Sequence, residues 1–335
     1  MTRLLARRLL FMLFVLWGVS VITFFLARVA PGDPARLIAG PHANAEAIAN
    51  IRAIYGLDQP LPVQYVQYLG GLLHGDLGTS FTTRRPVAQD LLAFFPATLE
   101  LSLFALLIGS SIGIAIGVLS ALRVGSAVDG ISRFVAVAGL SMPAFWLAIL
   151  LQLVIYSRLQ LLPIGGRLDT GMAAPPQVTG LMTIDSLLAG QLTTFVASVR
   201  HLILPVVTLG LAEVGLMARV VRTSMLEVVG ADYMRTAAAK GLTNRRITIR
   251  HGLRNALLPA VTILGLETAL LAGGVFLVET IFAWPGVGQY AFNAIRASDY
   301  NAIMGVTLVG AVIYVVINLI VDIAYLYLDP RIRYT

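Results

Sequence analysis

The sequence predicts an all-α polytopic membrane protein with six transmembrane helices and a small extracytoplasmic subdomain after the first helix. Hydrophobic residues make up 58% of the 335-residue chain and charged residues only 12%, and the mean hydropathy is +0.84. Soluble domains are far less apolar. About 20 apolar residues cross a bilayer as a helix, and such stretches occur at residues 9–29, 97–121, 134–157, 202–223, 257–281 and 303–327.

The first span, residues 9–29, follows an arginine-rich segment and resembles a secretory signal peptide at first sight. Its apolar run is longer than a typical signal core, and Arg28-Val29-Ala30 is a poor cleavage site. We therefore expect an uncleaved first helix that follows a cytoplasmic N-terminus at residues 1–8.

Residues 30–96, between the first two spans, are too many for a simple turn. Two stretches, 44–55 and 63–73, are compatible with helices, and Gly56, Pro60 and Pro62 separate them. We expect a folded extracytoplasmic subdomain that serves as a cap or as a platform for an external partner. Residues 97–327 form the transmembrane core, and within it the outer stretch 158–201 is rich in glycine and proline and is expected to be irregular.

Small residues and prolines in the spans indicate how the helices pack. Gly109, Gly113 and Gly117 lie four residues apart on one face of the second span, which allows another helix to approach closely. Pro143 and Pro205 remove backbone donors and should kink or start the third and fourth helices. Such bends suit a transporter, although packing alone also explains them.

Basic residues predict the orientation. If the N-terminus is cytoplasmic, the inside segments hold fifteen basic residues, and the outside loops hold eight that are spread over far more residues. Loops that are rich in Lys and Arg stay in the cytoplasm. Both termini, including residues 328–335, are therefore predicted to be cytoplasmic.

The most informative segment is the arginine-rich loop within residues 224–256. A basic loop can be only a topology anchor, but this loop also contains an alanine run that favours helix and a glycine suited to ending it. A short helix with a cationic surface, presented below a membrane bundle, is a docking device for a cytoplasmic partner. The candidate contact residues are Ala231, Asp232, Tyr233, Arg235, Thr236, Ala237, Ala238, Lys240 and Gly241.

Placing an ionisable side chain inside the bilayer costs free energy, and such residues often have a function. Glu213 and Glu267 lie about ten residues into the fourth and fifth predicted helices. They either line a hydrophilic pathway, where a carboxylate meets a cationic group such as a peptide amino terminus, or form structural hydrogen bonds between helices. For Asp322 we favour the structural interpretation. Glu100 and Glu279 lie nearer the ends of their predicted helices.

No catalytic or metal-binding residues are predicted. The only lysine, Lys240, is not part of a P-loop, and the HExxH and GxSxG motifs and cysteine are absent. His42 and His74, in the outer segment, are better explained as surface residues than as metal ligands. The net charge of +7 does not indicate nucleic-acid binding, because many basic residues lie in loops beside the membrane.

Several motifs together resemble permease subunits of ATP-binding-cassette (ABC) importers, in the branch that takes up dipeptides and oligopeptides and includes nickel and glutathione relatives. The resemblance covers essentially the full length and is strongest to the first of the two paired permeases. It rests on Asp232 to Leu242, Arg250 to Pro259, Pro31-Gly32-Asp33-Pro34, Tyr55 to Pro60, Gly75 to Ser80, Pro96 to Leu101, Glu279 to Gly288 and Asp329 to Arg333.

The central loop departs from the broad importer pattern in one respect. Where that pattern has Glu-Ala-Ala, three residues and then glycine, this chain has Arg235-Thr236-Ala237 before the same spacing to Gly241. The distance from Gly241 to Leu258-Pro259 is also longer than in sugar importers. Both differences resemble the peptide branch.

The resemblance implies the type I importer permease fold and a set of partners. The helix at 231–241 would fit a groove on a cytoplasmic ATPase, and two such ATPases would bind ATP and Mg²⁺, so this chain itself would hold no cofactor. A second homologous permease would complete the pathway, and an extracytoplasmic binding protein would deliver peptide. The location implied is the bacterial inner membrane, in contact with lipid.

Two other classes remain open at this level. A secondary transporter would use the membrane carboxylates for ion coupling, but no internal repeat is apparent and the docking loop would be unexplained. A structural or assembly protein would not need carboxylates near mid-membrane. Within the importer interpretation, short peptides are the first choice of substrate, and nickel, glutathione or haem cargo are alternatives.

Overall fold

The computed structural model describes residues 2–29, 35–36, 43–54, 56–243, 246–272 and 274–328. The predicted motifs at 31–34 and 329–333, and His42, lie outside these residues. The helices are α1 (Thr2–Val29), α3 (Ala45–Ile54), α4 (Leu61–Leu73), α5 (Val87–Leu122), α6 (Ala127–Ser141), α7 (Ala144–Leu151), η1 (Gln152–Arg158), α8 (Met182–Leu188), α9 (Leu192–Val229), α10 (Asp232–Ala239), η2 (Ile247–Leu253), α12 (Arg254–Ala272), α13 (Phe276–Ile281), α14 (Val287–Arg296) and α15 (Tyr300–Leu328).

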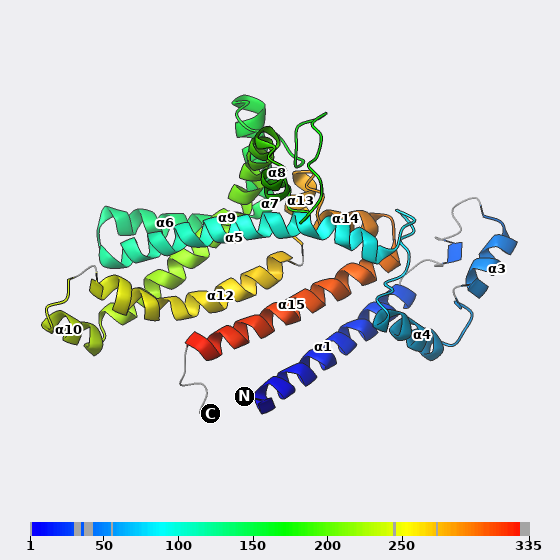
Figure 1. Ribbon diagram of the computed structural model, residues 1–335, viewed down its shortest axis with the longest axis horizontal. Coiled ribbons are helices and arrows are strands. Elements are labelled where there is room, and N and C mark those ends of the chain that lie inside the picture. Colours follow the sequence, from blue (N-terminus) through cyan, green and yellow to red (C-terminus); the bar gives the residue numbers. More distant parts are fainter. Residues whose placement is uncertain are drawn as a thin grey trace.

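The helical membrane class is confirmed. Among the described residues, five helical stretches are long and apolar enough to cross a membrane, and a sixth candidate is the bent pair formed by α6 with α7 and η1. Figure 1 shows that the molecule is elongated, with α10 at one end of its long axis and α3 at the other. The first residues of α1 and the last residues of α15 point toward the end that carries α10.

The third predicted span, 134–157, is interrupted at Pro143, where a kink or a helix start was expected. Helix α6 ends at Ser141, α7 begins at Ala144, and the two segments are bent by 101°. The break lies at Pro143, which has no backbone N–H and which disfavours helical geometry at the preceding residue. Accordingly, Met142 is extended, with φ −82° and ψ 122°. Pro205, by contrast, lies inside α9 and does not start it.

The predicted fifth helix, 257–281, is also corrected at both ends. The helical stretch begins ten residues earlier, at Ile247, and α12 ends at Ala272. The short helix α13 then begins at Phe276. Gly274, between α12 and α13, has a φ of +101° and approaches Gly288 so closely that an added Cβ would lie 2.9 Å from the Gly288 nitrogen. A side chain is excluded there, so the chain can turn sharply.

Hydropathy also underestimated the lengths of the other spans. Helix α5 begins at Val87 instead of residue 97, and α9 covers Leu192–Val229 instead of 202–223. Much of the predicted loop 224–256 is therefore helical, because α9 continues to Val229 and the next span begins at Ile247. Apolar runs record the part of a helix in the bilayer, whereas these helices extend beyond it.

The two helices expected in the outer segment 30–96 are present as α3 and α4. They do not form a unit with a separate core among the described residues, since α3 buries no side chain and α4 buries only Gln64. Helix α4 packs against α1, where Tyr65 shares a hydrogen bond of 2.9 Å with Ser20 and its ring meets Phe24 edge to face. The outer helix α4 is thus attached to the first span.

The turn at residues 78–80, which precedes α5, is attached to the segment between α14 and α15. The Ser80 hydroxyl donates to Asp299 Oδ2 at 2.6 Å, and Asn301 Nδ2 donates to the Thr79 carbonyl at 2.9 Å. Gly78 has a φ of +81° and lies against Asn301. The motif at 75–80 therefore joins the start of α5 to the junction of α14 and α15.

Helices α5 and α9 share the largest interface between any two helices of the described chain. The three glycines of α5 lie directly on α9. A Cβ added at Gly109 would lie 2.8 Å from Glu213 Cβ, and one added at Gly113 would lie 2.6 Å from Met217 Cβ. A Cβ added at Gly117 would lie 2.8 Å from the Ala218 carbonyl oxygen. Real Cβ atoms do not approach so closely, so glycine is required at all three positions. The three glycines therefore lie in the α5–α9 contact, as a close helix packing requires.

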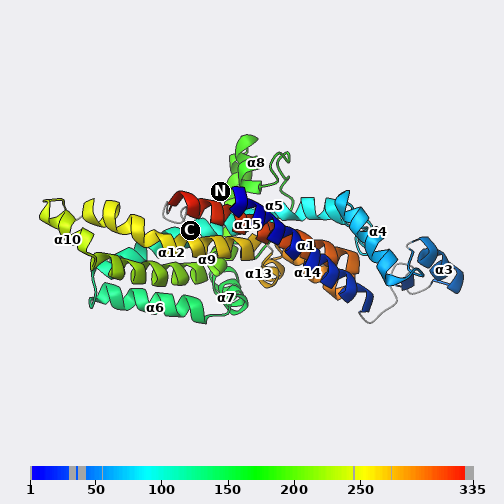
Figure 2. The ribbon, with the colours of Figure 1, turned by 90° about the horizontal axis from the view of Figure 1, so that it is seen from below.

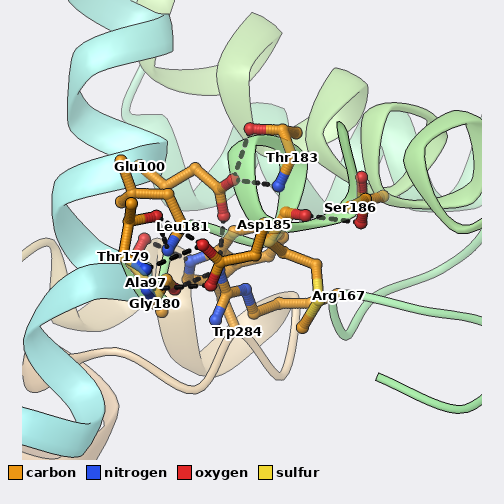
Figure 3. Close-up of polar contacts among 12 residues, drawn as sticks. Ala97, Glu100, Arg167, Thr179, Gly180, Leu181, Thr183, Asp185, Ser186 and Trp284 are labelled. Carbon is orange, nitrogen blue, oxygen red and sulfur yellow. Dashed lines mark hydrogen bonds and ion pairs between the residues drawn. The ribbon is translucent and has the colours of Figure 1, made fainter. Parts of the chain in front are cut away.

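A buried ion pair fixes the outer loop between η1 and α9 (Figure 3). Arg167 donates from Nη2 to Glu100 Oε2 at 2.6 Å and to the Gly180 carbonyl at 2.9 Å. Both the N–H and the hydroxyl of Thr183 donate to Glu100 Oε1 at 2.7 Å. The Arg167 guanidinium also lies over the Trp284 ring, 5.8 Å from its centroid. The stretch 158–201 is thus tied to α5 and to the α13–α14 turn. The expectation that it is irregular is wrong for Met182–Leu188, which form α8, and from Leu192, where α9 begins.

Asp185 of α8 organises the same loop. Its carboxylate accepts hydrogen bonds from the backbone N–H groups of Val178, Thr179 and Gly180 and from the Thr179 hydroxyl. Burial alone would raise the pKa of Asp185, but these donors outweigh burial and lower it below its usual range. This carboxylate therefore contributes stability above the unfolded pKa, and the contribution is lost as pH falls through the folded pKa.

Gly113→Ala is expected to destabilise the chain by about 1–3 kcal/mol, because the new methyl group overpacks the α5–α9 interface. Gly130→Ala on α6 is the matched control, since an added Cβ there meets nothing within 4 Å. The control should be neutral or stabilising, because alanine favours helix over glycine. Tryptophan-fluorescence melting of both purified variants measures the difference, and equal melting temperatures would contradict the packing role.

Arg167→Met is expected to cost about 3–5 kcal/mol, because it leaves Glu100, only 1% exposed, as a buried charge without its cation. The double variant Glu100→Gln/Arg167→Met removes both charges and should recover a large part of that loss. Thermal unfolding of the single and double variants tests the pair. A double variant that is less stable than Arg167→Met would argue against the buried ion pair.

Candidate functional site

Helix α10 is held against the ends of two long helical stretches by a small apolar cluster. Met234 and Ala237, three residues apart and on one face of α10, are buried against Ile247 of η2, with Val228 of α9 beside them. An added Cβ at Gly252 would lie 3.3 Å from Met234 Cε, so the glycine leaves room for the methionine. The inner face of α10 is therefore a packing surface.

The ends of α10 follow from local sequence. Asp232 lies in the first turn of α10, where its negative charge interacts favourably with the positive end of the helix dipole and stabilises the helix. At the other end, Gly241 has a φ of +75°, a conformation that suits glycine, and its N–H donates to the Ala238 carbonyl at 2.9 Å. The helix and glycine stop predicted from the alanine run are present.

The outer face of α10 is open to solvent at the extreme end of the molecule (Figure 1). The ion pair between Asp232 and Arg235 is 3.9 Å long and highly exposed, so it contributes little stability. Asn255 donates to the Tyr233 hydroxyl at 3.0 Å, which links α10 to the start of α12. The exposed candidates are Asp232, Tyr233, Arg235, Thr236, Ala238, Lys240 and Gly241.

Two of the candidate contact residues have other positions. Ala237 is buried on the inner face, and Ala231 is the half-buried residue that precedes the helix. Sequence reasoning did not identify Met234, Ile247 or Gly252 as the residues that seat α10. The apolar spacing of Met234 and Ala237 was the available signal, but their partner at 247 lies beyond the intervening loop.

The two pathway candidates occupy different environments. Glu213 is 4% exposed, and Ser110 of α5 donates to its Oε1 at 2.8 Å. Gly109 provides the space beside the Glu213 side chain. For Glu213, this geometry favours a structural hydrogen bond between helices over a position in a hydrophilic pathway. Glu267 of α12 is half-buried and has no hydrogen bond or ion pair with any residue that the structure describes.

The remaining membrane carboxylates have structural partners. Asp322 of α15 forms an ion pair with Arg8 of α1, in agreement with the structural interpretation. Glu279 of α13 is fully buried and accepts hydrogen bonds from the Thr98 hydroxyl at 2.8 Å and the Gln289 N–H at 2.9 Å. A Cβ added at Gly286 would lie 2.5 Å from Glu279 Oε2, which explains why the motif at 279–288 has a glycine at position 286.

No metal centre is evident in the described part of the chain, where no group of three or more His, Asp or Glu side chains is placed to hold an ion. His74 Nδ1 forms a hydrogen bond of 2.8 Å with the Gly70 carbonyl, one helical turn earlier.

Comparisons with known proteins agree with this arrangement. The family described as "Binding-protein-dependent transport system inner membrane component" matches residues 113–334, and the corresponding N-terminal family matches residues 1–102. Helix α10, Glu213 and Glu267 all lie inside the first match.

Three relatives illustrate the similarity. The probable D,D-dipeptide transport system permease protein DdpB of Escherichia coli is 48% identical over 318 residues, which cover 95% of this chain and 94% of the relative. The dipeptide transport system permease protein DppB of Alkalihalophilus pseudofirmus is 43% identical over 98% of each chain. The glutathione transport system permease protein GsiC of Salmonella choleraesuis is 39% identical, also over 98% of each chain.

Both family matches and these nearly full-length relatives agree with the motifs that resembled importer permeases and with the helical architecture. The chain belongs to the family of inner membrane permeases of binding-protein-dependent transport systems, which have the type I ABC importer permease fold.

Proposed function

We propose that this chain forms half of the translocation pathway of an ATP-driven importer for dipeptides or short oligopeptides, and that α10 couples it to a cytoplasmic ATPase. The observation that carries the proposal is the position of α10. Its inner face packs on the ends of α9 and η2, and its outer face is open at the end of the molecule. A force applied to that outer face acts directly on two helical stretches that enter the membrane.

The proposed orientation places α10 and both termini in the cytoplasm. The start of α1 and the end of α15 point toward the α10 end, and α3 lies at the opposite end (Figure 1). The α10 segment and the arginines that follow it form the most basic part of the chain, and such segments stay inside. The outer helices α3 and α4 and the loop that Arg167 anchors would then face an extracytoplasmic binding protein.

The proposed assembly contains a second homologous permease and two ATPases, which would hold ATP and Mg²⁺. A second permease would supply the other wall of the pathway. Glu267 supports this arrangement, because it is a half-buried carboxylate without a partner in the described chain. In the pathway it would attract the amino terminus of a peptide. Glu213, which is hydrogen-bonded between α5 and α9, would support the wall.

Peptide is the favoured substrate because relatives named for dipeptide transport are 39–48% identical to this chain, a range that includes the glutathione relative at 39%. Glutathione is itself a short peptide and is the nearest alternative cargo; nickel and haem are more distant. A secondary transporter is the alternative mechanism. It would give no role to the exposed face of α10.

Ala238→Glu is expected to abolish co-purification of the ATPase and ATP-dependent uptake, because it places a charged side chain on the exposed face of α10. Ala127→Glu, at the exposed start of α6, is the matched control and should retain both activities. Both variants should melt like the unmodified chain. Affinity purification from native membranes with mass spectrometry gives the result, and an ATPase retained at full yield by Ala238→Glu would count against α10 as its docking site.

Glu267→Gln is expected to lower peptide uptake about tenfold without changing the melting temperature, which corresponds to loss of about 1.4 kcal/mol of interaction with the peptide cation. Glu227→Gln, exposed in the last turn of α9, should transport normally. Uptake of labelled dipeptide by proteoliposomes that contain the whole complex tests both variants. Normal uptake by Glu267→Gln would remove this residue from the pathway.

A further inference from the structure

A cavity with a mainly apolar surface and three arginines among its lining residues lies between α5, α6 and α9, toward the end of the molecule that carries α10. Its volume is about 250 Å³, and its polar lining consists of Ser120, Ser132, Arg133, Arg219, Arg222 and Thr223. The apolar part of the lining includes Ala136, Val137 and Ala218. None of these residues has a role in the proposed coupling site or pathway.

One of the three arginines is held in place by the protein. Arg222 donates from Nε to Asp129 Oδ1 at 2.8 Å and to the Ser120 hydroxyl at 3.0 Å, and from Nη2 to Asp129 Oδ2 at 3.2 Å. Asp129 also accepts from the Ser120 hydroxyl at 2.6 Å and from the Gly125 N–H at 3.1 Å. This network fixes one wall of the cavity.

The other two arginines leave the cavity with excess positive charge. Arg133 is 61% exposed and only 3.6 Å from the already paired Asp129, and Arg219 has no ion-pair partner in the described chain. The lining contains three arginines, and the one nearby carboxylate, Asp129, pairs with Arg222 and lies 3.6 Å from Arg133, so these four residues carry a net charge of +3 − 1 = +2. Such a site is complementary to a phosphate group, which arginine binds with directed hydrogen bonds.

The cavity lies near the end of α5 and the start of α6. Ser120 is two residues from the end of α5 at Leu122, and Arg133 is six residues after the start of α6 at Ala127. At 1.5 Å per residue these positions are about 3 and 9 Å from the helix ends. That depth is suited to a lipid headgroup, because the polar interface of a bilayer is several ångströms thick on each side.

An apolar stripe runs from the cavity along the outer face of α6. Ile131, Phe134, Val137 and Leu140 follow one another at intervals of three residues and are 65%, 74%, 55% and 38% exposed. Helix α6 packs on α9 and α5 and lies at the edge of the molecule (Figure 2). Acyl chains can lie along this stripe while the headgroup occupies the cavity.

We propose that the cavity binds the phosphate of an anionic phospholipid, with Arg133 and Arg219 as the main ligands and the α6 stripe in contact with its acyl chains. The combination of excess positive charge, interfacial depth and an adjoining apolar surface favours a lipid over a soluble phosphate compound. Arg222 acts as a positioning residue, since its guanidinium is already bonded to Asp129. The site would couple the position of α6 to the composition of the membrane.

The test uses the chain in the complex with which it purifies, placed in phosphatidylcholine nanodiscs that contain a photo-crosslinkable phosphatidylglycerol. Labelling of α6 and α9 peptides is expected, with displacement by unlabelled phosphatidylglycerol but not by extra phosphatidylcholine. Arg133→Gln/Arg219→Gln should weaken this labelling on the order of thirtyfold, given about 1 kcal/mol per basic residue near an anionic surface. Arg123→Gln, on the exposed turn after α5, is the control and should label normally.

Three results would overturn the proposal. Labelling that phosphatidylcholine displaces as well as phosphatidylglycerol would show an apolar contact without headgroup selection. Displacement by millimolar glycerol 3-phosphate would show a site for soluble phosphate compounds. Crosslinks from α6 to another protein subunit in place of lipid would show that this face is a protein interface. The competition experiments use the unmodified chain, so they decide the matter even if the double variant does not fold.

Discussion

The close contact of α5 with α9 is the constraint on which the rest of the structure depends. Backbone atoms of α9 lie where side chains of α5 would otherwise project, and only glycine at positions 109, 113 and 117 allows this. In a membrane, apolar burial does not draw helices together, so close packing and hydrogen bonds must do so. The hydrogen bond from Ser110 to Glu213 is possible because the two helices are this near.

Around α8 and the α13–α14 turn, polar interactions replace small-residue packing. Glu100, Arg167 and Thr183 form a buried network that spans three segments far apart in sequence, and Glu279 with Thr98 forms a second one nearby. Neither network is a pathway by itself, because the charged oxygens are already bonded. Their effect is to hold the irregular outer loop and the α13–α14 turn against α5, so that this end can act as a rigid surface.

At the other end, the chain combines a fixed helix with an open surface. Met234 and Ala237 secure α10 on the extended ends of the spans, while polar and small residues of α10 remain exposed. The apolar inner contacts of α10 are those that the proposed coupling role requires. Near the same end, the Asp129–Arg222 pair ties the start of α6 to α9. A lipid at Arg133 and Arg219 would act on that connection, and so on the helix that carries the proposed coupling site.

The sequence alone determined the features that depend on local chemistry. Apolar runs identified the spans, Pro143 marked the break in the third one, and the alanine run with Gly241 defined α10. The spacing of the three glycines predicted a packing face, because helical periodicity fixes which residues lie together. Motif resemblance predicted the permease family, which the comparisons confirmed. The same methods misplaced helix ends, because hydropathy detects only the portion of a helix that suits lipid.

Only the tertiary structure decided which partners the polar groups have. Glu100 pairs with Arg167, which is 67 positions away, and Glu213 accepts from Ser110, which is 103 positions away. Glu213 and Glu267 look equivalent in the sequence, yet one is hydrogen-bonded at a helix interface and the other has no partner in the described chain. The physical reason is that a pairing depends on how neighbouring helices are positioned, and that position results from packing over the whole bundle.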